Sequence, residues 1–281
     1  MNVKFRLTLC SAALLTLSVG NLEAGVLAYT LVSDGVLGTT DLNTGAFSLI
    51  ANNNLFYAGL GVANGTLYGV SNAGSVLWSI NPANGSASAV GFDPTADYRY
   101  FGSTTSGLYA IGYEPGTGWG VLLSINPSNG AATLIGPTGL GNVTGYGNLS
   151  TNSSTLYFAE GGMLYTIDTT TGAATQVGYM GGAQIQGMIS EGGVLYGAEY
   201  SPDFQLDTLN TTNGSATAGA SLSAIVKYGT VVGLAPDPLT PPPPSSVPEP
   251  STMVLLGVGG AVLFALRKRF GYNRGIQISH R

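Results

Sequence analysis

The chain has 281 residues, of which 43 are glycine and only 8% are charged. This composition is typical of a β-rich protein with many tight turns, and it excludes a protein made mainly of amphipathic helices. The single histidine, His280, lies near the C-terminal end, which excludes a Ser-His-Asp, Cys-His or His-ligated metal site in the rest of the chain. Calcium-loop and nucleotide-loop motifs are also missing, so we expect neither a metal nor a cofactor.

Residues 1–24 have the features of a secretory signal peptide. Lys4 and Arg6 form a basic start, an apolar run follows over 7–19, and residues 22–24 offer a cleavage site. The apolar run is too short for a typical membrane span. We therefore expect the protein to be exported.

A hairpin unit recurs through residues 25–237. Each copy has an apolar strand, a turn that begins with Asp or Asn and ends with Gly, and a strand of small residues. A strand that carries a tyrosine, and in most copies a short Gly-rich strand, come before them. The turn glycines follow at intervals of 40, 45, 42 and 42 residues and are Gly45, Gly85, Gly130, Gly172 and Gly214.

Four strands repeated about every 42 residues are typical of a propeller blade, and the body has room for five. The first copy lacks its Gly-rich strand, whereas the body ends on an unpaired strand of this type at 231–235. We predict that this last strand completes the first blade and closes the ring. An open solenoid is the alternative, and the complementary ends argue against it. The predicted fold is all-β, a five-bladed β-propeller of four-stranded blades, with one short transmembrane helix after it.

The body is strongly acidic. From 25 to 246 it contains two basic residues against twelve acidic ones, a net charge of −10. Such a surface repels phosphate backbones, which excludes nucleic acid as a partner. Cations and neutral polymers such as polysaccharide are compatible partners.

Four acidic residues follow the tyrosine-bearing strands and form a candidate ligand rim. Glu160 and Glu199 come three residues after the blade tyrosine, and Asp34 and Glu114 come five residues after it. We expect them at one rim of the central channel. They are solvated loop acids, a rim that binds a cation or a glycan, or an acid and base that act on a sugar. No catalytic residue is assigned.

A second candidate is a surface aromatic cluster. Its members are expected in a loop-like insertion after Asp93 and Pro94, and they are Tyr98, Arg99, Tyr100 and Phe101. The tyrosines of the repeated strands are instead expected to pack between blades.

The C-terminal part differs from the body. Residues 238–246 are rich in proline and predict an extended linker. A transmembrane helix is predicted at 252–266, although its length falls short of a typical bilayer core. The basic residues that follow it indicate that the body lies outside and that 270–281 form a cytoplasmic basic tail.

Three features in this order resemble the PEP-CTERM sorting tail. They are a Val-Pro-Glu-Pro motif, a short apolar helix interrupted by glycine, and a basic cluster, all within 247–269. The motif residues are Val247, Pro248, Glu249, Pro250, Arg267, Lys268 and Arg269. The resemblance implies export in a Gram-negative bacterium, anchoring in the inner membrane before processing, recognition by an exosortase, and cleavage near residues 248–250. It also implies delivery to the cell surface or to an exopolysaccharide matrix, as in a biofilm.

We therefore expect a non-enzymatic binding or structural module with exosortase, the membrane and extracellular polysaccharide as its partners. The propeller resembles repeat propellers only in general, which implies no activity. The alternative is a secreted glycan-active hydrolase that uses the rim carboxylates. It would need two carboxyl groups either about 5 Å or about 6.5 to 9.5 Å apart in an accessible pocket.

Overall fold

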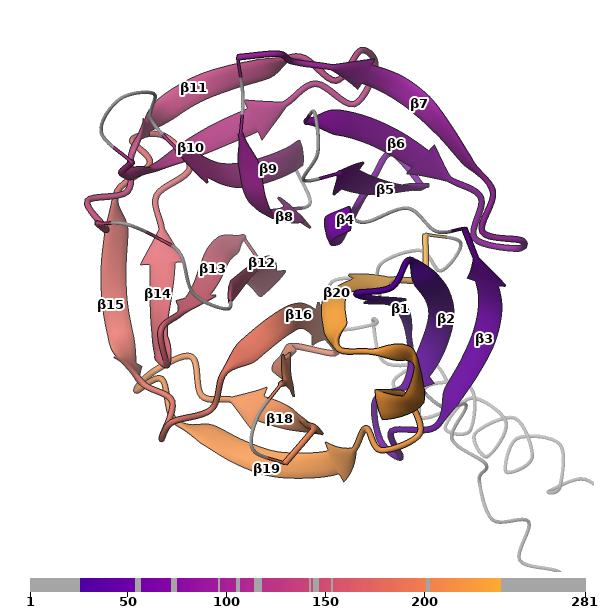
Figure 1. Ribbon diagram of the computed structural model, residues 1–281. Coiled ribbons are helices and arrows are strands. Elements are labelled where there is room, and N and C mark those ends of the chain that lie inside the picture. The colour runs from indigo at the N-terminus through magenta and orange to yellow at the C-terminus, as the bar shows by residue number, and fades with distance from the viewer. Residues whose placement is uncertain are drawn as a thin grey trace, which may run out of the picture. The chain divides into compact units, whose positions relative to one another are not determined.

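The computed structural model describes residues 26–238 apart from 54–56, 72–74, 96, 105–106, 114–117, 142, 144–146, 153 and 201–202. The chain divides into two units, and the body belongs to the first, Met1–Asp237. Five antiparallel sheets of four strands each form the blades of a propeller around one axis (Figure 1). The predicted all-β, five-bladed fold is therefore confirmed.

Each blade runs from an inner strand at the axis to an outer strand at the periphery (Figure 1). Blade 1 consists of β20 (Val231–Pro236), β1 (Leu27–Val32), β2 (Val36–Asp41) and β3 (Phe47–Asn52). Blade 2 consists of β4 (Tyr57–Ala63), β5 (Thr66–Ser71), β6 (Val76–Ile80) and β7 (Ala87–Phe92). Blade 3 consists of β8 (Tyr98–Thr104), β9 (Gly107–Tyr113), β10 (Gly120–Ile125) and β11 (Ala132–Pro137).

The last two blades follow the same order. Blade 4 consists of β12 (Gly147–Asn152), β13 (Thr155–Glu160), β14 (Met163–Ile167) and β15 (Ala174–Tyr179). Blade 5 consists of β16 (Ile185–Glu191), β17 (Val194–Glu199), β18 (Gln205–Leu209) and β19 (Ala216–Ser221). A short 3-10 helix, η1 (Val226–Tyr228), precedes β20.

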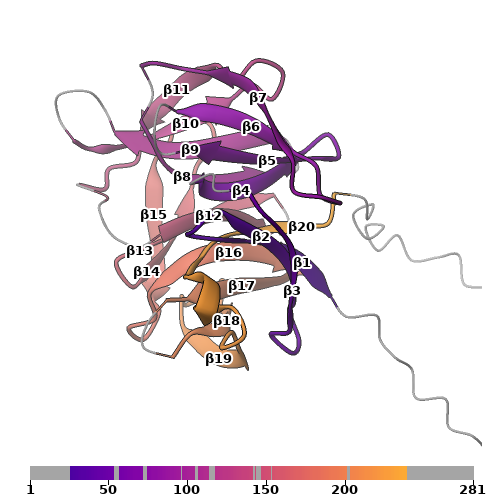
Figure 2. The same ribbon diagram turned by 45° about the vertical axis from the view of Figure 1, so that its right-hand side comes forward.

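The last strand closes the ring. β20 pairs antiparallel with β1, so that Ala28 lies opposite Pro236 and Thr30 lies opposite Leu234. Figures 1 and 2 both show β20 beside β1, although the two strands come from opposite ends of the body. This is the predicted closure, and it covers the inner edge of β1, which would otherwise be unpaired.

One face of the propeller carries the five turns between the third and fourth strands of the blades, and we name it the turn face. In each turn an Asp or Asn side-chain oxygen accepts a hydrogen bond from the N–H two residues later, at 2.7 to 2.9 Å. The glycine four residues after it has a φ between 70° and 84°, which glycine adopts without strain. The accepting residues are Asp41, Asn81, Asn126, Asp168 and Asn210.

These turn glycines also lie against the outer strand of the preceding blade. A β-carbon on Gly130 would lie 2.8 Å from the carbonyl oxygen of Gly91 in β7, and one on Gly214 would lie 2.6 Å from the Cα of Gly178 in β15. The other three turn glycines make similarly close approaches to β19, β3 and β11. Neighbouring blades therefore fit together only because both surfaces carry small residues.

The hydrophobic core is divided into five clusters, one at each junction between neighbouring blades. Each cluster contains, or packs against, one tyrosine of the repeated second strand, as predicted. These tyrosines are Tyr29, Tyr68, Tyr109, Tyr157 and Tyr196.

Polar side chains connect the inner strands. The amide of Asn148 in β12 donates to the carbonyl oxygens of Gln186 in β16 and Val232 in β20, both at 2.9 Å. The Ser103 hydroxyl in β8 accepts from the N–H of Val62 in β4 at 2.9 Å. Asn148 is fully buried. Its two hydrogen bonds join three inner strands in the middle of the ring.

Candidate functional site

The three described acids of the predicted rim lie on the face opposite the turn face, which we name the connection face. It carries the links from the second to the third strand of each blade and from each blade to the next. Asp34 is exposed in the turn between β1 and β2, whereas Glu160 and Glu199 are the last residues of β13 and β17. Glu114 lies outside the described residues. The acids thus share a face, but they lie at second strands and not at the innermost ones.

Glu160 is half-buried and lies among tyrosines of blades 3 and 4. Burial chiefly, and then the negative charge of Glu160, raise the pKa of the Tyr100 and Tyr165 phenols. The Tyr100 hydroxyl also donates to the carbonyl oxygen of Val143 at 3.1 Å. Glu160 therefore belongs to a junction between blades.

Glu199 has a different environment, because a second carboxyl group lies beside it. Asp207 in β18 pairs with Gly197 in β17, so its side chain projects on the same side of blade 5 as Glu199, two residues further along. Glu199 is 6% exposed and Asp207 is 2% exposed. The Gln205 amide donates to the Glu199 carboxylate at 3.1 Å.

These acids share an acidic and largely dehydrated environment. Burial raises the pKa of Asp207 to about 6, and the charges of Glu199 and Asp203 add to the shift. Burial also raises the pKa of Glu199, against the hydrogen bond from Gln205, which lowers it. One carboxylate oxygen of Asp207 has no hydrogen-bond partner among the described residues. This pair was not predicted from the sequence.

An alignment of the blade sequences would have marked Asp207 as an unusual residue for its position. Counting back from the Asx turns, the positions equivalent to it in blades 2, 3 and 4 hold Trp78, Leu123 and Tyr165. A carboxylate at a position that is otherwise apolar or aromatic is unusual for a buried strand. Its partner, however, follows only from the register of two strands.

The predicted surface aromatic cluster lies in a strand and not in a loop. Tyr98 and Phe101 are fully buried in β8, and Tyr100 is 6% exposed. The expected surface location is therefore wrong for all three rings, which belong to the cores between blades. The consecutive residues Tyr100 and Phe101 enter different core clusters, because this inner strand packs on both sides.

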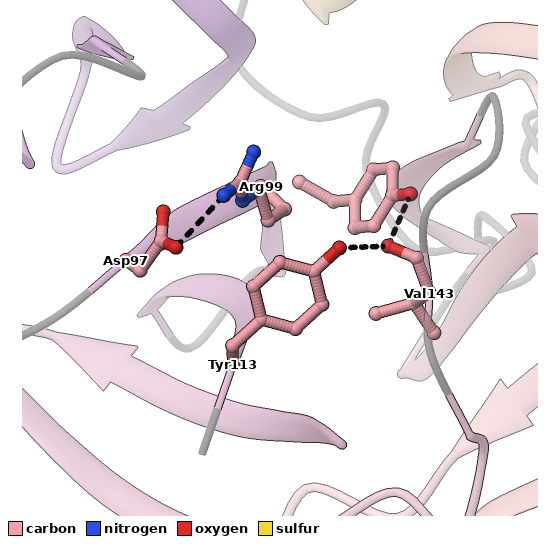
Figure 3. A network of polar contacts seen from close by, with 5 residues as sticks. Asp97, Arg99, Tyr113 and Val143 are labelled. Atoms are coloured by element: carbon pink, nitrogen blue, oxygen red, sulfur yellow. Dashed lines mark hydrogen bonds and ion pairs between the residues drawn. The ribbon is translucent and has the colours of Figure 1, made fainter. Parts of the chain in front are cut away.

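Arg99 is the exposed member of this segment. Its guanidinium contacts the Asp97 carboxylate at 2.9 Å and lies 4.8 Å from the centre of the Tyr113 ring, whose hydroxyl donates to Val143 at 2.9 Å (Figure 3). One of the two basic residues of the body is thus already paired.

Within the described ranges, no three His, Cys, Asp or Glu side chains converge so as to hold a metal ion. No described helix is both long and apolar enough to cross a membrane. The predicted signal peptide, the transmembrane helix at 252–266, the motif residues within 247–269 and the tail at 270–281 all lie outside the described residues.

The fold defines the body as a five-bladed β-propeller. Beyond it, residues 246–269 match the PEP-CTERM protein-sorting motif, which confirms the resemblance seen in the sequence. The motif implies export, exosortase-dependent processing at the membrane, and sorting to the cell surface. No curated protein matches the chain.

The chain is similar to three solved structures among those that match it. A chain of the nidogen/laminin complex is 12% identical with a TM-score of 0.52, over 75% of this chain and 81% of that one. Regucalcin from Agrobacterium tumefaciens, described as a calcium-binding protein, is 16% identical with a TM-score of 0.46, over 70% and 71%. TolB from Acinetobacter baumannii is 10% identical with a TM-score of 0.44, over 69% and 52%. At these identities the similarity concerns the fold alone.

Proposed function

We propose that the protein is a non-enzymatic module that an exosortase delivers to the cell surface or matrix, where its propeller binds extracellular polysaccharide. The observation that carries this proposal is the combination of a closed propeller with a sorting motif at 246–269. A ring of five interlocked blades is a stable body for display outside the cell, and propellers commonly serve as binding scaffolds.

The charge of the body favours a neutral polymer over a polyanion. Its only basic residues are Arg99 and Lys227. Arg99 is paired with Asp97, and the Lys227 ammonium lies 4.7 Å from the centre of the Tyr228 ring. A polyanion would therefore meet a surface with a net negative charge and few cations to neutralise it.

The environment of the carboxyl groups supports a binding role over hydrolysis. A glycosidase needs two carboxyl groups that reach the glycosidic bond from opposite sides. Glu199 and Asp207 lie near each other, but their side chains are almost completely buried. Asp34 is exposed in a turn of blade 1, and Glu160 is packed among tyrosines of another junction. This arrangement supports the proposed non-enzymatic role over the hydrolase.

Fractionation and binding test this function together. Intact-mass analysis of membrane, surface and medium fractions should detect a surface form without the sorting tail only in cells that have the exosortase. The full chain should co-sediment with polysaccharide extracted from its host without releasing reducing ends. If the tail is retained whether or not the cells have the exosortase, the proposed sorting step is wrong. If the full chain does not co-sediment with the polysaccharide, the proposed binding role of the propeller is wrong. Release of reducing ends would instead favour the hydrolase.

A further inference from the structure

Three aromatic side chains of the body are conspicuously exposed. Phe92 is 60% exposed, Trp119 is 53% exposed and Tyr179 is 58% exposed, and they are the exposed aromatic residues within the described ranges. Each exposed ring offers a large apolar surface that a ligand with an apolar face can cover.

The strand directions place all three rings on the connection face. Phe92 and Tyr179 are the last residues of the outer strands β7 and β15, and Trp119 directly precedes the third strand β10. Both kinds of position lie at the end of a blade away from its Asx turn. The rings therefore come from blades 2, 3 and 4, which follow one another around the axis (Figure 1).

Two glycines lie beside the Tyr179 side chain. A β-carbon on Gly162 would lie 3.5 Å from the ring, and one on Gly182 would lie 3.4 Å from its hydroxyl. The two glycines have φ values of 77° and 99°, a region that other residues seldom adopt. No side chain from these positions covers the ring, which remains available for stacking.

We propose that these three rings, named here the aromatic rim, bind an extended neutral polysaccharide by stacking on sugar rings at separate points along one chain. A hexose has an apolar C–H face and a polar hydroxyl edge, which matches an exposed aromatic ring beside a polar surface. This assignment rests on the proposed function, and it names the residues and the ligand class.

Two observations favour a long neutral chain over a small or an anionic ligand. Rings on three separate blades are suited to a polymer, because several weak contacts along one chain add up to useful avidity. The same face carries Asp34, Glu160 and Glu199, which disfavour a polyuronate by like-charge repulsion.

Binding by ring-substituted variants of the full chain tests the aromatic rim. Affinity electrophoresis in gels containing dextran, a neutral β-glucan or host polysaccharide would measure binding, with alginate as the polyuronate. We expect Phe92→Ala, Trp119→Ala and Tyr179→Ala each to weaken binding about fivefold, and the triple variant to weaken it about fiftyfold or more. Trp119→Phe should retain most of the binding, because it keeps a ring.

Leu49→Ala and Leu134→Ala are matched controls. These leucines are 52% and 59% exposed, but they lie within the outer strands β3 and β11 and carry no ring. They should leave both binding and thermal unfolding unchanged. The triple variant should unfold at nearly the wild-type temperature, so that a loss of binding is not a loss of fold.

The outcomes separate the two proposals. Wild-type protein that binds none of the polysaccharides contradicts the proposed function and the aromatic rim together. Wild-type binding that survives in the triple variant overturns the aromatic rim and leaves the function standing. Preferential binding to alginate also overturns the aromatic rim as a site for neutral polysaccharide, because the ligand would then be a polyanion. Self-association that disappears in the triple variant overturns it too, because the rings would then contact a second copy of the chain.

Discussion

The two faces of the propeller differ in how strictly they preserve the repeat. On the turn face every blade has the same Asx turn with a glycine at its end, and the links from third to fourth strand have five or six residues. On the connection face the links from second to third strand vary from two residues in blade 4 to six in blade 3. The irregular face also carries the rim acids, the buried pair and the exposed rings.

This difference shows which parts of the repeat serve the fold. The turn glycines are doubly constrained, by their positive φ and by the backbone of the neighbouring blade. The connection face has fewer constraints of this kind, since β-carbons on Gly118 and Gly139 would meet nothing within 4 Å. The links of this face therefore differ in length from blade to blade, as is usual for surface loops.

The largest effect should come from substituting a turn glycine. Gly130→Ala places a β-carbon against the backbone of Gly91 and forces a residue other than glycine to a φ of 72°. We expect it to lower the free energy of unfolding by about 3 kcal/mol, because neither backbone yields easily. Thermal or denaturant unfolding would measure the loss.

Gly118→Ala is the matched control in the same blade. Gly118 has a φ of 69°, and its added β-carbon meets no atom, so it should cost only about 1 kcal/mol of stability. Equal losses for the two variants would show that backbone strain alone matters and that the fit between blades contributes little.

The buried carboxyl pair should make the free energy of unfolding depend on pH. Because the pKa of Asp207 is raised to about 6, the folded protein holds this proton more tightly than the unfolded chain does. The free energy of unfolding should therefore fall as pH rises from about 4 to about 6, and remain low above that. Lowering the pH from 7 to 5 should stabilise the protein by about 1 kcal/mol.

Asp207→Asn should remove most of this pH dependence and raise the unfolding temperature at pH 7.5. The raised pKa of Glu199 accounts for a smaller remainder. Asp34→Asn makes the same change of residue type at an exposed aspartate of the same face and serves as the matched variant. An unchanged slope in Asp207→Asn would contradict the assigned environment of this carboxyl group.

Arg99→Ala should have the smallest effect on stability. It removes an exposed ion pair with Asp97 and a cation–π contact with Tyr113, both of which solvent weakens. We expect a loss of about 0.5 kcal/mol or less, which decreases further in high salt. A loss above about 2 kcal/mol would show that the contact supports the inner strand β8 far more than its exposure suggests.

The fold could be predicted because its constraints are local and repeated. The Asp or Asn that begins each turn and the glycine that ends it, such as Asn126 and Gly130, are marked in the sequence by their chemistry and spacing. Closure could be predicted because the missing strand of the first repeat and the extra strand after the last complement each other.

The candidate site was harder to predict, because it depends on contacts between strands and blades. Asp207 and Glu199 are eight residues apart, and only their register brings them together. The segment from Tyr98 to Phe101 has the polar and aromatic mixture of a surface loop, yet two core clusters take up its rings. Conversely, Phe92 and Tyr179 look like ordinary strand residues, and their exposure follows from their place at the periphery.

The pairing of β20 with β1 has a consequence for how the protein is made. Ala28 and Pro236 are partners across the length of the body, so the first blade lacks its inner strand until nearly the whole propeller has been synthesised. Forming this pairing requires closing a loop of about two hundred residues, which is entropically costly and slow. A chain interrupted at any earlier point would expose an unpaired, uncharged strand edge. Only a chain that extends through β20 can complete the first blade, so a chain that ends before Val231 leaves the inner edge of β1 unpaired.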